Sequence, residues 1–218
     1  MARRYELIVF DWDGTLMDST AMIAQSIQLA CKDLGLPVPS KAQASQVIGL
    51  GLADALAQAV PDLDPAMVPQ MVERYRHYYL TRDHQLSLFD GARELLVALK
   101  ERGHVLAVAT GKSRLGLDRA LGVAGVGNFF DATRCADESF SKPHPGMLLE
   151  LMEQAAVDPA ATLMIGDTTH DLLMAANAGT DGVGVSYGAH DLESLRSVPS
   201  RAIVDSVDAL QQWLLAHA

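Results

Sequence analysis

Residues 7–15 read Leu-Ile-Val-Phe-Asp-Trp-Asp-Gly-Thr, and this stretch decides the fold. Its four leading apolar residues predict a short strand buried in a parallel sheet. Two carboxylates, Asp11 and Asp13, follow the strand directly, and Gly14 allows the chain to turn sharply after them. Because ligands of open α/β sheets bind outside the carboxyl ends of the strands, the same stretch also predicts a functional site.

The two carboxylates form a pair with a defined geometry. In extended backbone Asp11 and Asp13 project from one face, roughly 6.5–7 Å apart, and Trp12 projects from the other. Two like charges at that separation are unfavourable unless a cation or a shared proton offsets them, and an oxygen-preferring cation such as Mg²⁺ fits best. One carboxylate could then attack an electrophile while the other exchanges a proton. For this stretch alone, a solvated acidic pair at an Asp-Gly turn is an equally good interpretation.

Composition limits the function classes. The chain has 218 residues, 49% hydrophobic and 20% charged, which suits one soluble core or a core with a modest insertion. The net charge of −10 argues against nucleic acid and against an anionic membrane as partners. Cys31 and Cys135 form no Cys-x-x-Cys pair, so we expect reduced, packed thiols. The apolar run behind Arg3 and Arg4 is too short for a signal peptide or a membrane span, so we expect a cytoplasmic protein. We further expect a monomer or a homodimer.

The order of the predicted elements indicates an insertion. Residues 16–86 read as helical throughout, with helices predicted over 20–34, 41–48, 52–60 and 66–82. After residue 86 the pattern alternates, with strands predicted over 104–109, 129–133, 163–165 and 182–186 and near 203. Helices are predicted over 91–102, 115–121, 145–156, 170–178 and 207–216. This alternation predicts a Rossmann-like α/β core of three layers around a parallel sheet, formed by residues 1–15 and 87–218. Residues 16–86 would form an all-helical cap over the site.

Two further strand ends carry polar groups. Thr110-Gly111-Lys112 follows the predicted strand 104–109, and its hydroxyl, amide and ammonium groups suit an oxyanion such as phosphate. Lys142 lies in Ser141-Lys142-Pro143-His144-Pro145, where the prolines restrict the backbone and could hold the ammonium at a fixed point. Each motif alone also fits an ordinary turn or a solvated lysine.

The predicted strand 163–165 leads to a third carboxylate, Asp167, and Asp171 follows four residues later. The two share a face if a helix begins there, and an acidic residue in a first helical turn is also favourable by itself. Four polar motifs, each following a predicted strand in chain order, favour one joint site over four coincidences.

These residues resemble the four motifs of the haloacid dehalogenase-like (HAD) hydrolases. The motifs are Asp11-x-Asp13-Gly14-Thr15, then Thr110, then Lys142, and finally Gly166-Asp167-x-x-x-Asp171. The resemblance covers the whole chain, because the helical insertion between the first two motifs matches the C1-capped members. It is strongest to phosphoglycolate phosphatase-like members, through residues 10–19 and 141–145.

The resemblance implies a division of chemistry among the carboxylates. Asp11 would be the nucleophile that forms an aspartyl-phosphate. Asp13 would protonate the leaving oxygen and later deprotonate the attacking water. Mg²⁺ would be held by the carboxylates of Asp11 and Asp167 and by the backbone carbonyl of Asp13.

The remaining motif residues would handle the phosphoryl group. The resemblance implies that Thr110 and Lys142 hold its oxygens with help from the Gly111 amide, and that Asp171 orients Lys142 or a water on the metal. Positioning and charge stabilisation of this kind must supply most of the very large rate enhancement that phosphate-monoester hydrolysis requires.

The sequence therefore predicts a Mg²⁺-dependent phosphatase acting on a small phosphorylated metabolite, either phosphoglycolate or a sugar phosphate. A phosphomutase on the same fold and a non-catalytic phospholigand-binding protein are the alternatives. Thr15 favours hydrolysis over transfer, because the family's sugar mutases often differ there, and the presence of both Asp11 and Asp13 favours catalysis. The break at residues 49–51, Gly-Leu-Gly, is either the loop that selects the substrate or a plain helix–helix turn.

Overall fold

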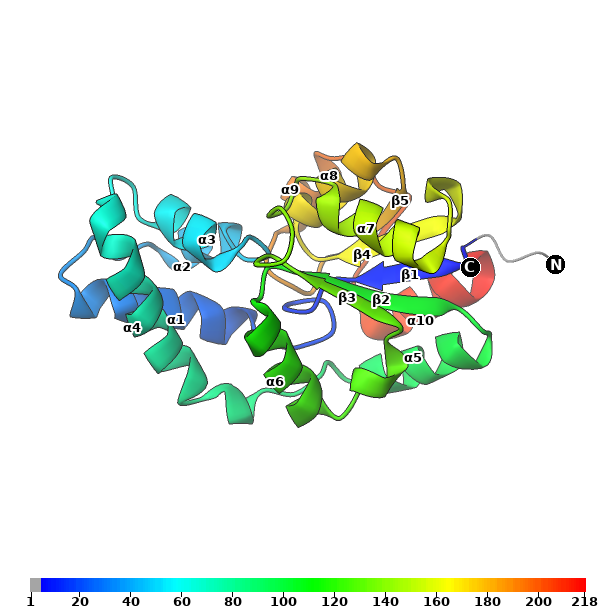
Figure 1. Ribbon diagram of the computed structural model, residues 1–218, viewed down its shortest axis with the longest axis horizontal. Coiled ribbons are helices and arrows are strands. Elements are labelled where there is room, and N and C mark those ends of the chain that lie inside the picture. The colour runs from blue at the N-terminus through cyan, green and yellow to red at the C-terminus, as the bar shows by residue number, and fades with distance from the viewer. Residues whose placement is uncertain (1–4) are drawn as a thin grey trace.

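The computed structural model describes residues 5–218 and contains one six-stranded sheet in the order β3-β2-β1-β4-β5-β6 (Figure 1). The strands are β1 (Leu7–Phe10), β2 (Val105–Thr110), β3 (Ala132–Cys135), β4 (Thr162–Gly166), β5 (Asp181–Val185) and β6 (Ala202–Val204). Every neighbouring pair is parallel, with β1 between β2 and β4. The predicted α/β core is therefore confirmed, and the predicted strand 7–10 lies at its centre.

Helices cover both faces of the sheet, as Figure 1 shows. The core helices are α5 (Ala92–Glu101), α6 (Arg114–Ala124), α7 (Gly146–Ala155), α8 (Thr169–Ala178), α9 (Leu192–Arg196) and α10 (Val207–His217). The side chains of β1 alternate between the faces. Ile8 and Phe10 pack with side chains of α5, α6 and α10, whereas Leu7 and Val9 pack with side chains of α7 and α8. This arrangement gives the three layers that the alternating pattern predicts.

The segment between β1 and α5 is helical, as predicted, and lies beyond the carboxyl ends of the strands (Figure 1). It contains α1 (Thr20–Asp33), α2 (Lys41–Gln46), α3 (Leu52–Ala59) and α4 (Val68–Leu80), and these helices enclose an apolar cluster of their own. Short 3₁₀ turns are η1 (Pro65–Met67), η2 (Asp83–Gln85), η3 (Gly127–Phe129) and η4 (Pro159–Ala161). The division at residues 15/16 and 86/87 stays a prediction, and Leu16 and Met17 pack with the core cluster.

Two elements differ from the sequence-based expectation. Strand β3 begins three residues later than predicted, because Gly127–Phe129 form the η3 turn and Phe129 packs on the core cluster from there. Ladder pairing with β2 begins only at Ala132. Helix α9 is not predicted, because its five residues are too few to show a helical repeat of apolar positions. In the structure, the Asp191 side chain caps this helix by accepting a hydrogen bond from Ser194 N.

Three expectations about the chain as a whole meet the structure in different ways. Cys31 and Cys135 are buried and free, as predicted. Within residues 5–218, none of the helices is both long and apolar enough to span a membrane. Arg3 and Arg4 lie outside the described residues, and the cytoplasmic location stays a prediction.

Candidate active site

Asp11 extends β1 by one hydrogen bond, since its backbone N–H donates to Ile165 O over 2.9 Å. Trp12 packs in the same cluster as Phe10 and lies edge-on to Phe130, so the alternation of faces continues past the strand. Gly14 then has φ of +81°, and a Cβ there would collide with the Asp167 carboxylate. The position therefore requires glycine both for its backbone angle and for its contact.

Asp167 follows β4 and is fully buried. Thr15 Oγ1 donates to its Oδ1 over 2.9 Å, and the Ala189 amide donates to its Oδ2 over 2.7 Å. A Cβ at Gly188 would also collide with this side chain. The Asp167 carboxylate thus has one orientation, fixed by groups from two other segments of the chain, at residues 15 and 188–189.

Asp171 lies in the first turn of α8 and forms a capping box with Thr168. Its Oδ2 accepts from the Thr168 amide over 3.0 Å and from the Thr168 hydroxyl over 2.7 Å. Its Oδ1 remains for Lys142, whose Nζ lies 2.7 Å from it and also 2.7 Å from Asp11 Oδ1. The fully buried Lys142 ammonium therefore bridges two carboxylates, which is the contact that the expected orienting role of Asp171 requires.

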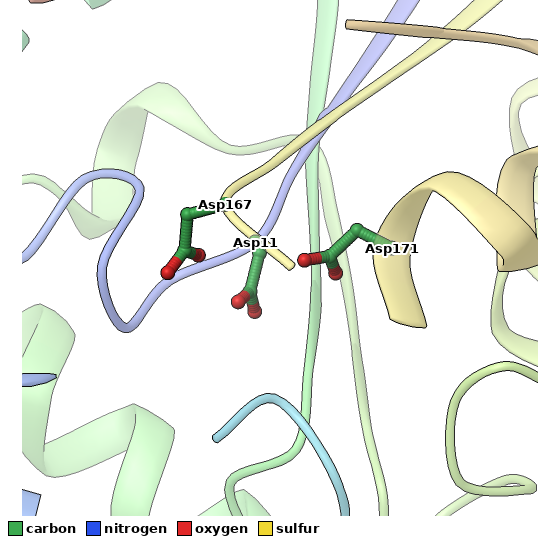
Figure 2. Close-up of side chains that lie close together, drawn as sticks. All are labelled: Asp11, Asp167 and Asp171. Carbon is green, nitrogen blue, oxygen red and sulfur yellow. The ribbon is translucent and has the colours of Figure 1, made fainter. Parts of the chain in front are cut away.

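Three carboxylates converge in one place, two of them directly after β1 and β4 and the third in α8 (Figure 2). Oxygens of Asp11, Asp167 and Asp171 all lie within 4.8 Å of one another. If all three are ionised, Lys142 offsets only one of the three negative charges. Burial raises the pKa of Asp11 to about 7 despite the Lys142 ammonium, and burial and the Asp11 carboxylate raise the pKa of Asp167 well above its usual range.

This cluster fits a divalent cation. Its donors are carboxylate oxygens, the ligand type that Mg²⁺ prefers, and its excess of two negative charges matches the charge of one such ion. Asp11 Oδ2 is buried and accepts no hydrogen bond from any residue between 5 and 218, so a buried oxygen remains for an external partner. The Asp13 carboxylate lies outside the cluster and contacts Lys112 Nζ and the Ser19 hydroxyl, and the role of the Asp13 backbone carbonyl as a metal ligand stays a prediction from the family resemblance.

A cavity of about 1080 Å³ opens beside this cluster and is lined by Asp11, Asp13, Thr110 and Gly111. Thr110 Oγ1 accepts the Lys112 amide over 3.2 Å, which leaves its O–H group to donate. Of the predicted site residues, Lys142, Asp167 and Asp171 are buried outside that lining. The structure thus brings all the predicted site residues to one edge of the sheet. Four of them line the cavity, and the other three are buried next to it.

The loop at residues 49–51 lies on the core. A Cβ at Gly111 would lie 2.6 Å from Gly49 O and would collide with Leu50 O, so the second motif needs glycine where the cap rests. Gly51 N donates to Ser141 Oγ over 2.9 Å. The same loop lines the cavity, so it contacts both the core motifs and the space for a ligand.

The histidines near the site also hold the cap. Nε2 of His170 and Nε2 of His190 lie 3.0 and 3.2 Å from Gln46 O, at the end of α2. His190 Nδ1 accepts the Thr169 amide over 3.1 Å, so its Nε2 carries the proton that is donated. Both side chains therefore anchor the cap to the core.

The surroundings of Asp13 differ from the sequence-based expectation, because the Lys112 ammonium, expected to meet an oxyanion, contacts Asp13 instead, and because Tyr79 is not predicted at all. Lys112 Nζ lies 3.1 Å from Asp13 Oδ2 and 3.0 Å from Tyr79 Oη of the cap. Burial disfavours the ammonium, but Asp13 and Tyr79 more than compensate, so the pKa of Lys112 lies above its usual value. Ser19 directly precedes α1, where a serine commonly caps a helix, but its hydroxyl donates to Asp13 Oδ1 over 2.6 Å and makes no capping bond. Lys112 stands beside the second motif, whereas no local pattern singles out Tyr79.

Comparison with known proteins assigns the chain to a family. A family model for haloacid dehalogenase-like hydrolases matches residues 8–185, which include all four motifs. The chain belongs to this family.

Two relatives of this HAD-like hydrolase are named phosphatases, and the similarity to each extends over nearly its full length. It is 38% identical over 206 residues to "Probable phosphatase IndB" of Dickeya dadantii, covering 92% of this chain and 89% of that protein. It is 31% identical over 222 residues to a phosphoglycolate phosphatase of Vibrio cholerae, covering 98% of both. A crystal structure described as a predicted phosphoglycolate phosphatase from Haemophilus somnus superposes with a TM-score of 0.86 at 28% identity, covering 98% of this chain and 99% of that one. The HAD-like hydrolase is therefore a phosphoric monoester hydrolase, similar to phosphoglycolate phosphatases.

Proposed function

We propose that this enzyme hydrolyses a small phosphate monoester through an aspartyl-phosphate on Asp11 and requires Mg²⁺. The observation that carries the proposal is the buried cluster of three carboxylates and one lysine, in which Asp11 keeps an oxygen without a hydrogen-bond partner among residues 5–218. Asp11, Asp167 and the Asp13 carbonyl would hold the ion. When bound, Mg²⁺ would offset negative charge on the phosphoryl oxygens.

In the first step, Asp11 attacks phosphorus, and the bond between phosphorus and the ester oxygen breaks. Asp13 supplies the proton that the departing oxygen takes up. Thr110 and the Gly111 amide donate to phosphoryl oxygens, and Lys142 opposes the negative charge that develops beside Asp11. Lys142 already contacts Asp11 and Asp171, so it needs little rearrangement during the reaction.

In the second step, water attacks the aspartyl-phosphate, Asp13 accepts a proton from it, and inorganic phosphate leaves. We propose that residues 16–86 act as a cap that excludes water during the first step and admits it for the second, over a core of residues 1–15 and 87–218. The contacts of the 49–51 loop with Gly111 and Ser141 support this arrangement, because the loop lies directly on the core.

Phosphoglycolate and sugar phosphates are the first substrates to test. The name of the Vibrio cholerae relative supports phosphoglycolate. The size of the cavity supports a larger leaving group, because about 1080 Å³ exceeds what a two-carbon alcohol fills. We propose that the partner is a small phosphorylated metabolite and that neither nucleic acid nor a membrane is involved.

The test uses the purified full chain with para-nitrophenyl phosphate. Turnover should require Mg²⁺, stop in EDTA and be abolished in Asp11→Asn, whereas Asp208→Asn, which alters an exposed carboxylate of α10, should keep full activity. Hydroxylamine trapping after an acid quench should label Asp11. Absence of turnover with every phosphate ester by the metal-loaded protein would favour a binding protein, and phosphate transfer without release of inorganic phosphate would favour a mutase.

A further inference from the structure

The cavity beside Asp11 continues between a cap helix and a core helix. Its lining includes Val72, Tyr75 and Leu80 of α4, and Leu115, Ala120 and Val123 of α6. Within each helix these positions are three, five or eight residues apart, so each set lies along one side of its helix. We call the space between these six residues the α4–α6 channel. Figure 1 shows α4 and α6 on the same side of the molecule, where the cap meets the core.

The mouth of the α4–α6 channel has unusually exposed apolar side chains. Leu115 is 82% exposed, Val123 is 59% exposed and Leu80 is 42% exposed. Phe140, which lines the same cavity, is also exposed. Exposed apolar side chains that line one cavity lose contact with water when an apolar ligand covers them, which is favourable.

Among the described residues, two of the three positively charged side chains that line the cavity already contact a carboxylate. Lys112 lies against Asp13 and Tyr79. Arg119 makes two contacts with Asp83, from Nε to Oδ2 over 2.7 Å and from Nη2 to Oδ1 over 2.9 Å. Arg76, the third cation among the described lining residues, is exposed on α4. The deep part of the cavity therefore offers little free positive charge to a carboxylate on the leaving group.

We propose that the preferred substrates are phosphate monoesters of a long or bulky, largely apolar alcohol, whose apolar part lies in the α4–α6 channel. The inference rests on the proposed function, because it places the phosphate at Asp11. Continuity supports this occupant, since one cavity joins Asp11 and Thr110 to Leu115 and Val123. Its volume of about 1080 Å³ is of the size that encloses a drug-sized ligand.

The test compares ethyl, butyl, hexyl and octyl phosphate below micelle-forming concentrations, with phosphoglycolate alongside. The alkyl leaving groups have nearly equal basicity, so their reactivity is constant and only the apolar contact changes. We expect kcat/KM to rise about fourfold for each added methylene until the channel is filled. We expect octyl phosphate to exceed phosphoglycolate.

Two variants locate the contact. Leu115→Asp and Val123→Ser alter exposed positions on α6, so neither endangers the core. Each should lower kcat/KM for octyl phosphate at least about tenfold more than for ethyl phosphate. Leu149→Asp is the matched control, because Leu149 is 47% exposed on α7 and lies outside the cavity lining. It should change neither value.

The outcomes separate the two proposals. Hydrolysis that is independent of alkyl length, or that is faster with phosphoglycolate than with octyl phosphate, would overturn the apolar leaving group and leave the proposed function standing. The same holds if Leu149→Asp and Leu115→Asp affect octyl phosphate equally. No turnover of any ester, including para-nitrophenyl phosphate, would overturn the proposed function itself.

Discussion

Removing divalent cations should make the stability of this enzyme fall as pH rises. In the fully buried site, the pKa of Asp11 is raised from 3.8 to about 7, with burial as the largest cause. Between these values the folded protein binds the proton more tightly than the unfolded chain does. The stabilising contribution of the protonated carboxyl is therefore complete below pH 3.8 and is lost as pH rises towards 7. A difference of about 3 units at about 1.4 kcal/mol per unit gives about 4 kcal/mol from Asp11 alone.

Two other groups change how steeply the free energy of unfolding depends on pH. The pKa of Asp167 is raised by burial and by Asp11, so it adds to the fall. The pKa of His190 is lowered by burial and by His170, so its contribution rises with pH up to the ordinary histidine value and opposes the fall. Mg²⁺ should flatten the curve, because the ion can replace the protons in offsetting the carboxylates.

The assay is urea unfolding followed by far-ultraviolet circular dichroism between pH 5 and 8, once in EDTA and once in Mg²⁺. Wild-type protein in EDTA should lose about 3 kcal/mol of unfolding free energy relative to Asp11→Asn across this range, because the part of the loss between pH 3.8 and pH 5 lies below it. The difference between the two proteins cancels the contribution of His190. A wild-type curve in EDTA that is parallel to that of Asp11→Asn would show that the Asp11 carboxylate is not held at an energetic cost, and the electrostatic reasoning would fail.

Three further predictions concern the cap, the Lys112 pair and the ion. Gly111→Ala should prevent the 49–51 loop from contacting the core and should lower kcat/KM by more than about tenfold. The matched control is Gly122→Ala in α6, where nothing lies within 4 Å of the added methyl group. This control should keep its activity and should stabilise the protein by up to about 1 kcal/mol in urea unfolding. Equal activity in both variants would contradict this role for the loop. Lys112→Met should lower the free energy of unfolding by about 3 kcal/mol by leaving the Asp13 carboxylate without its cation, and a loss below about 0.5 kcal/mol would mean that the pair is effectively solvated. Ca²⁺ in place of Mg²⁺ should inhibit turnover of para-nitrophenyl phosphate, because Ca²⁺ takes more and longer oxygen contacts and could draw in both oxygens of Asp11; full activity with Ca²⁺ would refute this.

The sequence by itself determined the central strand, the parallel α/β core, the helical insertion and the order of the motifs. These features depend on local periodicity and on chain order, which a single sequence contains. The chain between residues 7 and 15 could be interpreted as a strand that leads into a site because its apolar run, its carboxylates and its glycine are adjacent. The start of β3 could not be predicted in this way, because Phe129 is as apolar as a strand residue and only its packing in the η3 turn distinguishes it.

Tertiary structure alone decided which groups meet across the interface of cap and core. Ser19 has the pattern of a helix cap, yet its hydroxyl bonds to Asp13, and Tyr79 contacts Lys112 from a helix more than thirty residues away. The α4–α6 channel likewise exists only because side chains of two helices from different parts of the chain line one cavity. Such contacts depend on how packed elements are placed relative to one another, and the spacing of residues within one segment carries no information about that placement.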